Sequence, residues 1–251
     1  MLSKIYQQSV LSVFKDGKTD YDDLDPSNSL LWHANVRRMD FESFRDSMLS
    51  MAGLLDRTSV GGPSFNVTDE PFIFRRAVYA YIDRLDLPDL LSQFDIAAPE
   101  QPNTKRTTTI VPQQALFLLN SPFVATVVHN IVKRPEIVQA VAVDRDTNKG
   151  ISAIFRILFQ RLPTPVEREM ALNFLVRENK MQAEVVKQTQ SMREKATRDA
   201  AAKNNSRQQN IDTNIKQALV NDGELVERTA FSPWETLVQT LLFANEAAYV
   251  E

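Results

Sequence analysis

The 251-residue chain contains no cysteine and only two histidines, His33 and His129. The absence of thiols excludes disulfide bonds, a thiolate nucleophile, zinc sites built on cysteine and the C-x-x-C-H attachment of a c-type haem. Two histidines far apart in sequence also exclude a histidine-rich metal site within this chain. A Ser-His-Asp triad would have to use one of them. From this composition we expect no cofactor and no metal site.

Glycine is scarce as well, with 6 residues, against a share of roughly 7% in average proteins, which argues against a loop-rich all-β fold. The formal net charge of -3 gives no general attraction to nucleic acid or to acidic membranes. A continuous run of about 18 apolar residues is missing, and the first residues lack the apolar core and cleavage site of a signal peptide. The sequence therefore predicts no nucleic-acid partner, no membrane span and no targeting signal within this chain.

What the sequence does contain is clear helix punctuation. Prolines begin apolar-periodic stretches at Pro112, Pro122 and Pro135, and proline is favoured at the first position of a helix. The segments Thr164–Glu167 and Ser232–Glu235 have the spacing of a capping box, with proline directly after the hydroxyl residue. These signals predict a mainly α, irregular multi-helix fold, and we expect residues 1–251 to form a single domain.

Two segments depart from this pattern. In residues 76–82, Arg76, Val78, Ala80 and Ile82 alternate with Ala77, Tyr79 and Tyr81. This period of two, with β-branched and aromatic members, predicts a strand in a small β hairpin or sheet near 58–83. Residues 178–222 are rich in Gln, Lys, Arg, Glu, Asn and Ala with few apolar positions. They predict a protruding polar helical hairpin, with a partly disordered insertion as the alternative.

Five aspartates between positions 16 and 25 form an acidic loop. Its spacing does not match an EF-hand loop, because the glycine is misplaced and no glutamate stands at the twelfth position. A solvated turn capped by Asp25 and Asn28 is the favoured interpretation, with a metal site as the alternative.

Three segments combine apolar periodicity with polar side chains that have no obvious solvent role. They are RRMDFESFRDSML (37–49), RTTTIVPQQALFLLNSPF (106–123) and the closing ANEAAYVE (244–251). In the first, Asp40 is the expected cap of an amphipathic helix whose polar face carries Glu42, Arg45 and Asp46. We expect several of these side chains to join separated segments through buried charge-assisted hydrogen bonds, or to bind a ligand. The candidate residues are Arg38, Asp46, Arg76, Arg106, Gln113, Asn120 and Asn245.

Together with SKIYQQS (3–9), DPSNSLLW (25–32), FDIAAP (94–99) and FQRLPTPVE (159–167), these segments give the chain a resemblance to one family. It resembles the planctomycete-type domain of unknown function that sits at the C-terminus of large secreted proteins, commonly beside cytochrome c-like domains. The matches follow the family's order and span almost the whole chain. In that family further helical sequence precedes the first match, so the resemblance implies that this chain is N-terminally truncated, the C-terminal part of a larger domain.

The resemblance implies a periplasmic or secreted location and other domains of a larger polypeptide as partners, cytochrome c-like domains among them. Three functions stay open. The first is a structural or interaction domain. The second is a hydrolase or lyase acting on polysaccharide, which needs two carboxylates across a cleft, with Glu42, Asp46, Asp95 and Glu246 as candidates. The third is a glycan-binding module using aromatic side chains, for which the candidates are Trp32, Tyr79, Tyr81 and Trp234.

Overall fold

The structure is a computed structural model. It describes residues 24–35, 37–83, 85–97, 99–100, 102, 104, 106, 109–202 and 230–250. The chain divides into two compact units, one made of Met1–Pro163 with Val238–Glu251 and the other of Thr164–Leu237. The single-domain organisation that the sequence indicates stays a prediction.

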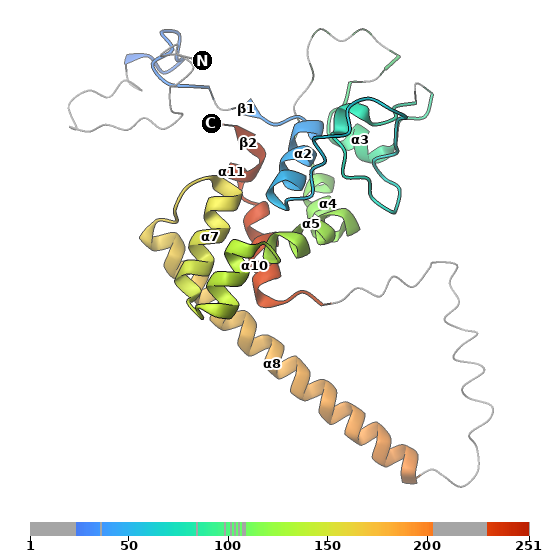
Figure 1. The fold of residues 1–251 in the computed structure, drawn as a ribbon, viewed down its shortest axis with the longest axis vertical. Helices are drawn as coiled ribbons and strands as arrows, with labels where there is room; N and C mark the ends of the chain where they lie inside the picture. The colour runs from blue at the N-terminus through green and yellow to red at the C-terminus, as the bar shows by residue number, and fades with distance from the viewer. Residues whose placement is uncertain are drawn as a thin grey trace. The chain divides into compact units, whose positions relative to one another are not determined.

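The described residues are mainly α-helical, as the sequence predicts (Figure 1). The elements of the first unit are β1 (Arg37–Arg38), α2 (Phe41–Met51), the 3₁₀ turn η1 (Ala77–Tyr79), α3 (Asp89–Gln93), α4 (Pro112–Asn120), α5 (Pro122–Val132), α6 (Pro135–Val138), the π-helical turn η2 (Gln139–Val143), α7 (Thr147–Phe159), α11 (Asn245–Ala248) and β2 (Tyr249–Val250). The second unit contains α8 (Pro165–Ala202), and α10 (Pro233–Leu242) begins in the second unit and ends in the first.

The expected helix starts are confirmed. Helices α4, α5 and α6 each begin with the predicted proline. Both capping boxes form. The amide of Glu167 donates to Thr164 Oγ1 at 3.3 Å while the amide of Thr164 donates to the Glu167 carboxylate at 2.7 Å, and Ser232 and Glu235 repeat the same pair of distances. Asp40 occupies the cap position of α2, although its side chain makes no capping bond.

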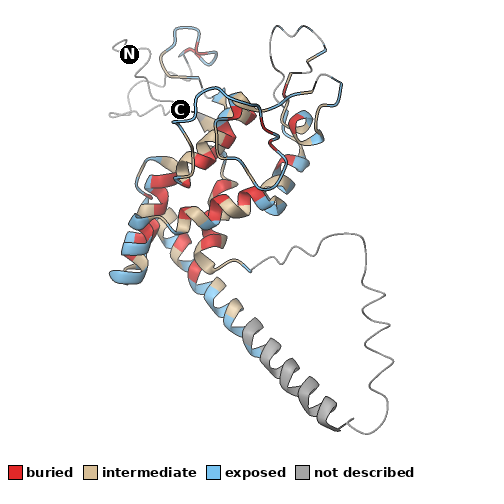
Figure 2. Ribbon diagram, turned by 45° about the vertical axis from the view of Figure 1, so that its right-hand side comes forward, coloured by how far each residue is buried: buried red, intermediate tan, exposed pale blue. Residues whose placement is uncertain are grey.

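The core of the first unit is built from one apolar face each of α2, α5 and α7. One face of α5 is buried, and the helix packs against α2. Helix α7 packs against α6 and η2, and Asp146 caps it by accepting the amides of Asn148 and Lys149. Figure 2 shows this burial as one-sided colouring along the helices. The buried side chains of α5 are Phe123, Val124, Val127, Val128 and Ile131.

A smaller apolar cluster lies at the start of α2. Phe41 packs there with Phe65, Val67, Leu91 and Ile96, which come from the long loops and from α3. This cluster holds segments with little regular structure against α2, because apolar burial is the main favourable term available to them.

The predicted β hairpin near 58–83 is wrong in its secondary structure. The two segments meet through single bridges, Asp56 to Arg75 and Phe65 to Ala80, and the middle of the expected strand is the 3₁₀ turn η1. The amide of Ala77 donates to the side chain of Asp46 on α2 rather than to a neighbouring strand. An acceptor supplied by a side chain removes the need for a sheet partner at that position.

Among the described residues, one strand pairing joins distant parts of the chain. Strands β1 and β2 are antiparallel, with Arg37 opposite Val250 and Arg38 opposite Tyr249. The amide of Met39 extends the contact by donating to the carbonyl of Ala248 at 2.8 Å. The segment 244–250 is thereby held beside the start of α2.

Helix α8 covers the first half of the predicted polar hairpin, as far as Ala202. The second half, from residue 203 to 222, lies outside the described residues, as do residues 16–23 of the acidic loop. Asp25, in the described part of that loop, is buried and accepts the amides of Ser29 and Leu30. These bonds lower the pKa of Asp25.

In the part of the chain that the structure describes, no single helix is long and apolar enough to cross a membrane. The pair α4 and α5 passes that test jointly by length and composition, and the two helices are bent by 56° at their junction.

Candidate functional site

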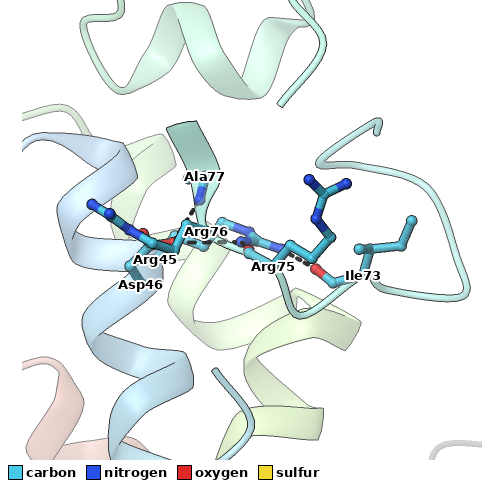
Figure 3. A network of polar contacts seen from close by, with 6 residues as sticks. All are labelled: Arg45, Asp46, Ile73, Arg75, Arg76 and Ala77. Atoms are coloured by element: carbon cyan, nitrogen blue, oxygen red, sulfur yellow. Dashed lines mark hydrogen bonds and ion pairs between the residues drawn. The ribbon is translucent and has the colours of Figure 1, made fainter. Parts of the chain in front are cut away.

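Arg45 is the most deeply buried charged residue on α2, with 1% of its surface exposed. Its Nη1 donates to the carbonyl of Arg75 at 3.0 Å, and its Nη2 donates to the carbonyl of Ile73 at 2.6 Å. Figure 3 shows the Arg45 side chain reaching from α2 to the loop that contains Ile73 and Arg75. A guanidinium group suits this position because it presents several donors in a fixed plane.

The same guanidinium contacts two aromatic rings. Its Cζ lies 5.3 Å from the ring centre of Phe65 and 5.2 Å from that of Phe123, within the range of cation–π attraction. Burial lowers the pKa of Arg45, and the carboxylate of Asp46, 3.7 Å away, partly opposes that effect. Arginine remains charged in proteins, so Arg45 is a buried cation shared between α2, α5 and two loops.

Asp46 contacts the two residues at the start of η1. Its Oδ1 accepts the amide of Ala77 at 2.8 Å, and its Oδ2 lies 3.6 Å from Nε of Arg76. The side chain of Asp46 is 17% exposed, whereas that of Arg76 is 59% exposed. Exposed ion pairs contribute little to stability, so the bond to Ala77 is the stronger part of this contact.

Glu42 and Arg106 form a two-pronged ion pair across 64 residues of sequence. Nη1 and Nη2 of Arg106 each donate to one carboxylate oxygen of Glu42 at 2.8 Å. This hydrogen bonding lowers the pKa of Glu42 and raises that of Arg106. The geometry is the bidentate one that gives arginine–carboxylate pairs their orientation.

Arg38, the second residue of β1, connects that strand to α4. It donates to Gln114 Oε1 at 2.7 Å and to the carbonyl of Thr109. Gln114 is buried and passes the connection on by donating to the carbonyl of Gln93 at 2.8 Å. The buried amide is therefore satisfied at both its oxygen and its nitrogen.

Two further carboxylates are engaged in the same way. Asp95 accepts the amide and the hydroxyl of Thr109, both at 2.7 Å. Glu246 on α11 accepts Arg161 Nε at 2.6 Å and Nη2 at 2.7 Å. Each of the four carboxylates that the sequence offers as catalytic candidates thus accepts hydrogen bonds from within the protein.

A partly open pocket of about 170 Å³ lies beside this network. Its polar lining includes Arg38, Asp40, Asp95, Gln114 and Asn245. Its apolar lining includes aromatic side chains from α2, from the loop after α3 and from the segment 242–249. Arg38, Asp95 and Gln114 are already bonded to other parts of the protein, as described above. Asp40 and Asn245 are exposed at this pocket.

The predicted site residues do not converge on one place. Arg38 and Asn245 line the pocket just described, Asn120 lines a second pocket near α5, and Arg106 lines a third beside η1. Asp46 and Arg76 lie outside all three. The expectation of burial is wrong for four residues, which are exposed because they stand at helix ends or on the outer side of a turn. These are Arg76, Gln113, Asn120 and Asn245.

The sequence interpretation missed Arg45 by assigning it to the polar face of α2. Arg45 follows Phe41 by four residues and precedes Leu49 by four, and both of those side chains are buried. Residues four apart lie on the same face of a helix. The spacing therefore placed Arg45 on the buried face of α2. Its charge led the sequence interpretation to assign it to the polar face instead. Arg161, the partner of Glu246, was also missed.

Two of the aromatic candidates have partners of their own. Trp32 donates from Nε1 to the carbonyl of Asp25 at 3.3 Å, and the ring of Tyr79 lies 4.8 Å from the guanidinium carbon of Arg75. Tyr81 is half exposed. Trp32 and Tyr79 therefore act in local packing.

Comparison with known proteins places this chain in a family. Residues 1–175 match the family described as "Protein of unknown function (DUF1553)". The chain belongs to this family. The chain matches no curated protein, and it matches no solved structure.

Proposed function

We propose that this member of the DUF1553 family is a non-catalytic structural or interaction domain of a multidomain extracytoplasmic protein. The observation that carries the proposal is that its candidate carboxylates already accept hydrogen bonds within the protein. Glu42, Asp46, Asp95 and Glu246 each accept hydrogen bonds from arginine or from the backbone. Such contacts hold separated segments of the chain together.

The pKa of Glu42 points the same way. A glycosidase needs a general acid whose pKa is raised so that it carries a proton near neutral pH. Hydrogen bonding to Arg106 lowers the pKa of Glu42, so this carboxyl group is ionised where a general acid has to be protonated. The pairing with Arg106 thus suits Glu42 to a structural role.

The partners that we propose are other domains of the same polypeptide, cytochrome c-like domains among them, in a periplasmic or secreted setting. The resemblance to planctomycete proteins motivates this part of the proposal. A polysaccharide partner is the alternative, as a substrate or as a bound ligand.

The test is incubation of the protein with a panel of sulfated and neutral glycans, followed by analysis of released products and of retained protein. The proposal expects neither release nor retention. Product release that is lost in Asp95→Asn would overturn it in favour of an enzyme. Retention without release would overturn it in favour of a glycan-binding module.

A further inference from the structure

A fourth pocket lies where three helices of the first unit meet, at the end of α2, the start of α6 and the second half of α7. It measures about 580 Å³, which is within the range of ligand pockets. Its charged lining residues are Arg134, Glu136 and Arg156. Its apolar lining consists of Met51, Ala153, Ile157 and Leu158. The pocket therefore combines apolar surface with more positive than negative charge.

One of the two lining arginines is explained by the fold. Arg134 donates from Nη1 to the carbonyl of Met51 and from Nη2 to the carboxylate of Glu136, both at 3.0 Å. Met51 is the last residue of α2, and the last carbonyl groups of a helix have no donor within the helix. Arg134 thus caps the end of α2, and Glu136 balances its charge.

Two further cations at this pocket have no carboxylate partner in the part of the chain that the structure describes. Arg156 is exposed on α7, and its guanidinium group makes no hydrogen bond to any described residue. Arg57 is also exposed and donates from Nη2 to the hydroxyl of Ser50, a lining residue, at 3.3 Å. That contact places the guanidinium group of Arg57 beside the pocket. Because a hydroxyl is neutral, two positive charges remain without a counter-charge.

The chemistry that fits this arrangement is a group of carboxylates on a short peptide segment. A guanidinium group binds a carboxylate through two parallel hydrogen bonds, and the donors of Arg156 are available for such a contact. The apolar lining suits an apolar side chain placed beside the carboxylates. A sulfated polysaccharide has no such side chain, and the formal net charge of -3 opposes the approach of a densely charged polyanion.

We propose that this pocket is the docking site for an acidic segment of a partner domain, in which carboxylates flank one apolar side chain. The carboxylates pair with Arg57 and Arg156, and the apolar side chain contacts Met51 and Ala153. This docking site rests on the proposed role as an interaction domain, and it specifies the charge of the partner and the surface that the partner contacts.

Four single substitutions separate the pocket from the general charge of the protein. Arg57→Gln and Arg156→Gln each remove one positive charge at the pocket, and Glu136→Gln removes a negative charge from its lining. Arg37→Gln is the matched control, because it removes the same charge before the start of α2, whereas the pocket lies at the end of that 11-residue helix. All four side chains are exposed, so all four variants are expected to fold.

The probe is a blocked pentapeptide with two glutamates on each side of one leucine, and its neutral match has glutamine in place of every glutamate. Binding is followed at low salt by the amide chemical shifts of the protein. We expect a Kd of about 1 mM for the acidic peptide and binding at least about fivefold weaker for the neutral one, since each exposed ion pair adds little. Shifts of the Ser50 and Arg156 amides should mark the site.

Arg57→Gln and Arg156→Gln are each expected to weaken binding of the acidic peptide about two- to fivefold, and Glu136→Gln to strengthen it about twofold. All three effects should shrink as salt screens the charges. Arg37→Gln should leave the affinity unchanged within about 1.5-fold, because its charge is distant and screened.

Equal binding of the acidic and neutral peptides, equal losses in Arg156→Gln and Arg37→Gln, or no saturation at about 10 mM peptide would each overturn the docking site. A sulfated oligosaccharide that displaces the acidic peptide would also overturn it, by assigning the same arginines to a glycan. A failed peptide titration without glycan release or retention contradicts only the docking site. Release of glycan products contradicts the non-catalytic role and leaves the peptide result standing.

Discussion

Two arginine contacts of α2 differ in what surrounds them. Arg45 is buried, and its closest partners are neutral carbonyl groups and aromatic rings. Arg106 reaches Glu42 from a distant loop with a side chain that is 37% exposed. The buried cation has no water to replace lost partners, whereas the exposed pair can exchange its partner for solvent. The contrast indicates that Arg45 determines the local shape, while Arg106 adds a smaller, charge-dependent stabilisation.

Arg45→Met is the change with the largest expected effect. It leaves the carbonyls of Ile73 and Arg75 without their donor and removes both ring contacts, so we expect a loss of about 3 kcal/mol in the free energy of unfolding. Urea unfolding measures it. Arg156→Met, at an exposed position on α7, is the matched control and should stay within about 0.5 kcal/mol. Equal stability of the two variants would contradict the claim that the buried Arg45 determines the local shape.

Asp46→Ala comes next. It removes the acceptor of the Ala77 amide and the carboxylate closest to Arg45, and we expect a loss of about 2 kcal/mol. In a chain of this size that corresponds to a melting temperature lower by about 4–8 °C. Asp46→Asn keeps an oxygen acceptor and should lose about half as much. If both variants melt alike, the charge rather than the hydrogen bond explains the contact.

The Glu42–Arg106 pair should give a smaller effect that depends on pH. The pKa of Glu42 is lower in the folded protein than its ordinary value of 4.5. Its contribution is therefore complete above about pH 4.5 and is lost as pH falls through the folded pKa. Glu42→Gln should cost about 1 kcal/mol at pH 7, and the difference from the unchanged protein should shrink toward pH 3. A difference that does not vary with pH would contradict this assignment.

The two capping boxes should show the smallest difference in stability. Glu235 is buried, whereas Glu167 is only partly so. Ser232→Ala is expected to cost about 1 kcal/mol and Thr164→Ala about 0.5 kcal/mol, since removing a cap costs up to about 2 kcal/mol. Chemical denaturation of both single variants checks the order. The reverse order would show that burial of a capping box does not determine how much it stabilises the protein.

The helices were largely predictable because their signals are local. A proline after a serine or threonine, with a glutamate two residues beyond, defines a helix start without any knowledge of the rest of the chain. The starts at Pro112, Pro122, Pro135, Pro165 and Pro233 all follow this logic or its simpler proline form. The end of α2 was also predictable, since Gly53 has a positive φ of 71° that favours glycine.

The segment around η1 was not predictable, because its conformation depends on a partner from another element. Its alternating pattern is typical of a strand, but the Ala77 amide finds its acceptor on α2. The site shows the same limit. The sequence indicated which segments carry unusual polar residues, yet Glu42 pairs with Arg106 and Arg38 with Gln114 over 64 and 76 positions. Such partners are set by packing, which periodicity does not encode.

The most direct test of the account is hydrogen exchange at the amide of Ala77, the point where α2 replaces a strand as hydrogen-bond partner. We expect this amide to be protected in the unchanged protein. In Asp46→Ala its exchange should be at least about tenfold faster relative to amides in the middle of α5, and Asp46→Asn should retain most of the protection. Exchange at the same rate in all three proteins would contradict the claim that side chains of α2 hold the separated segments in place.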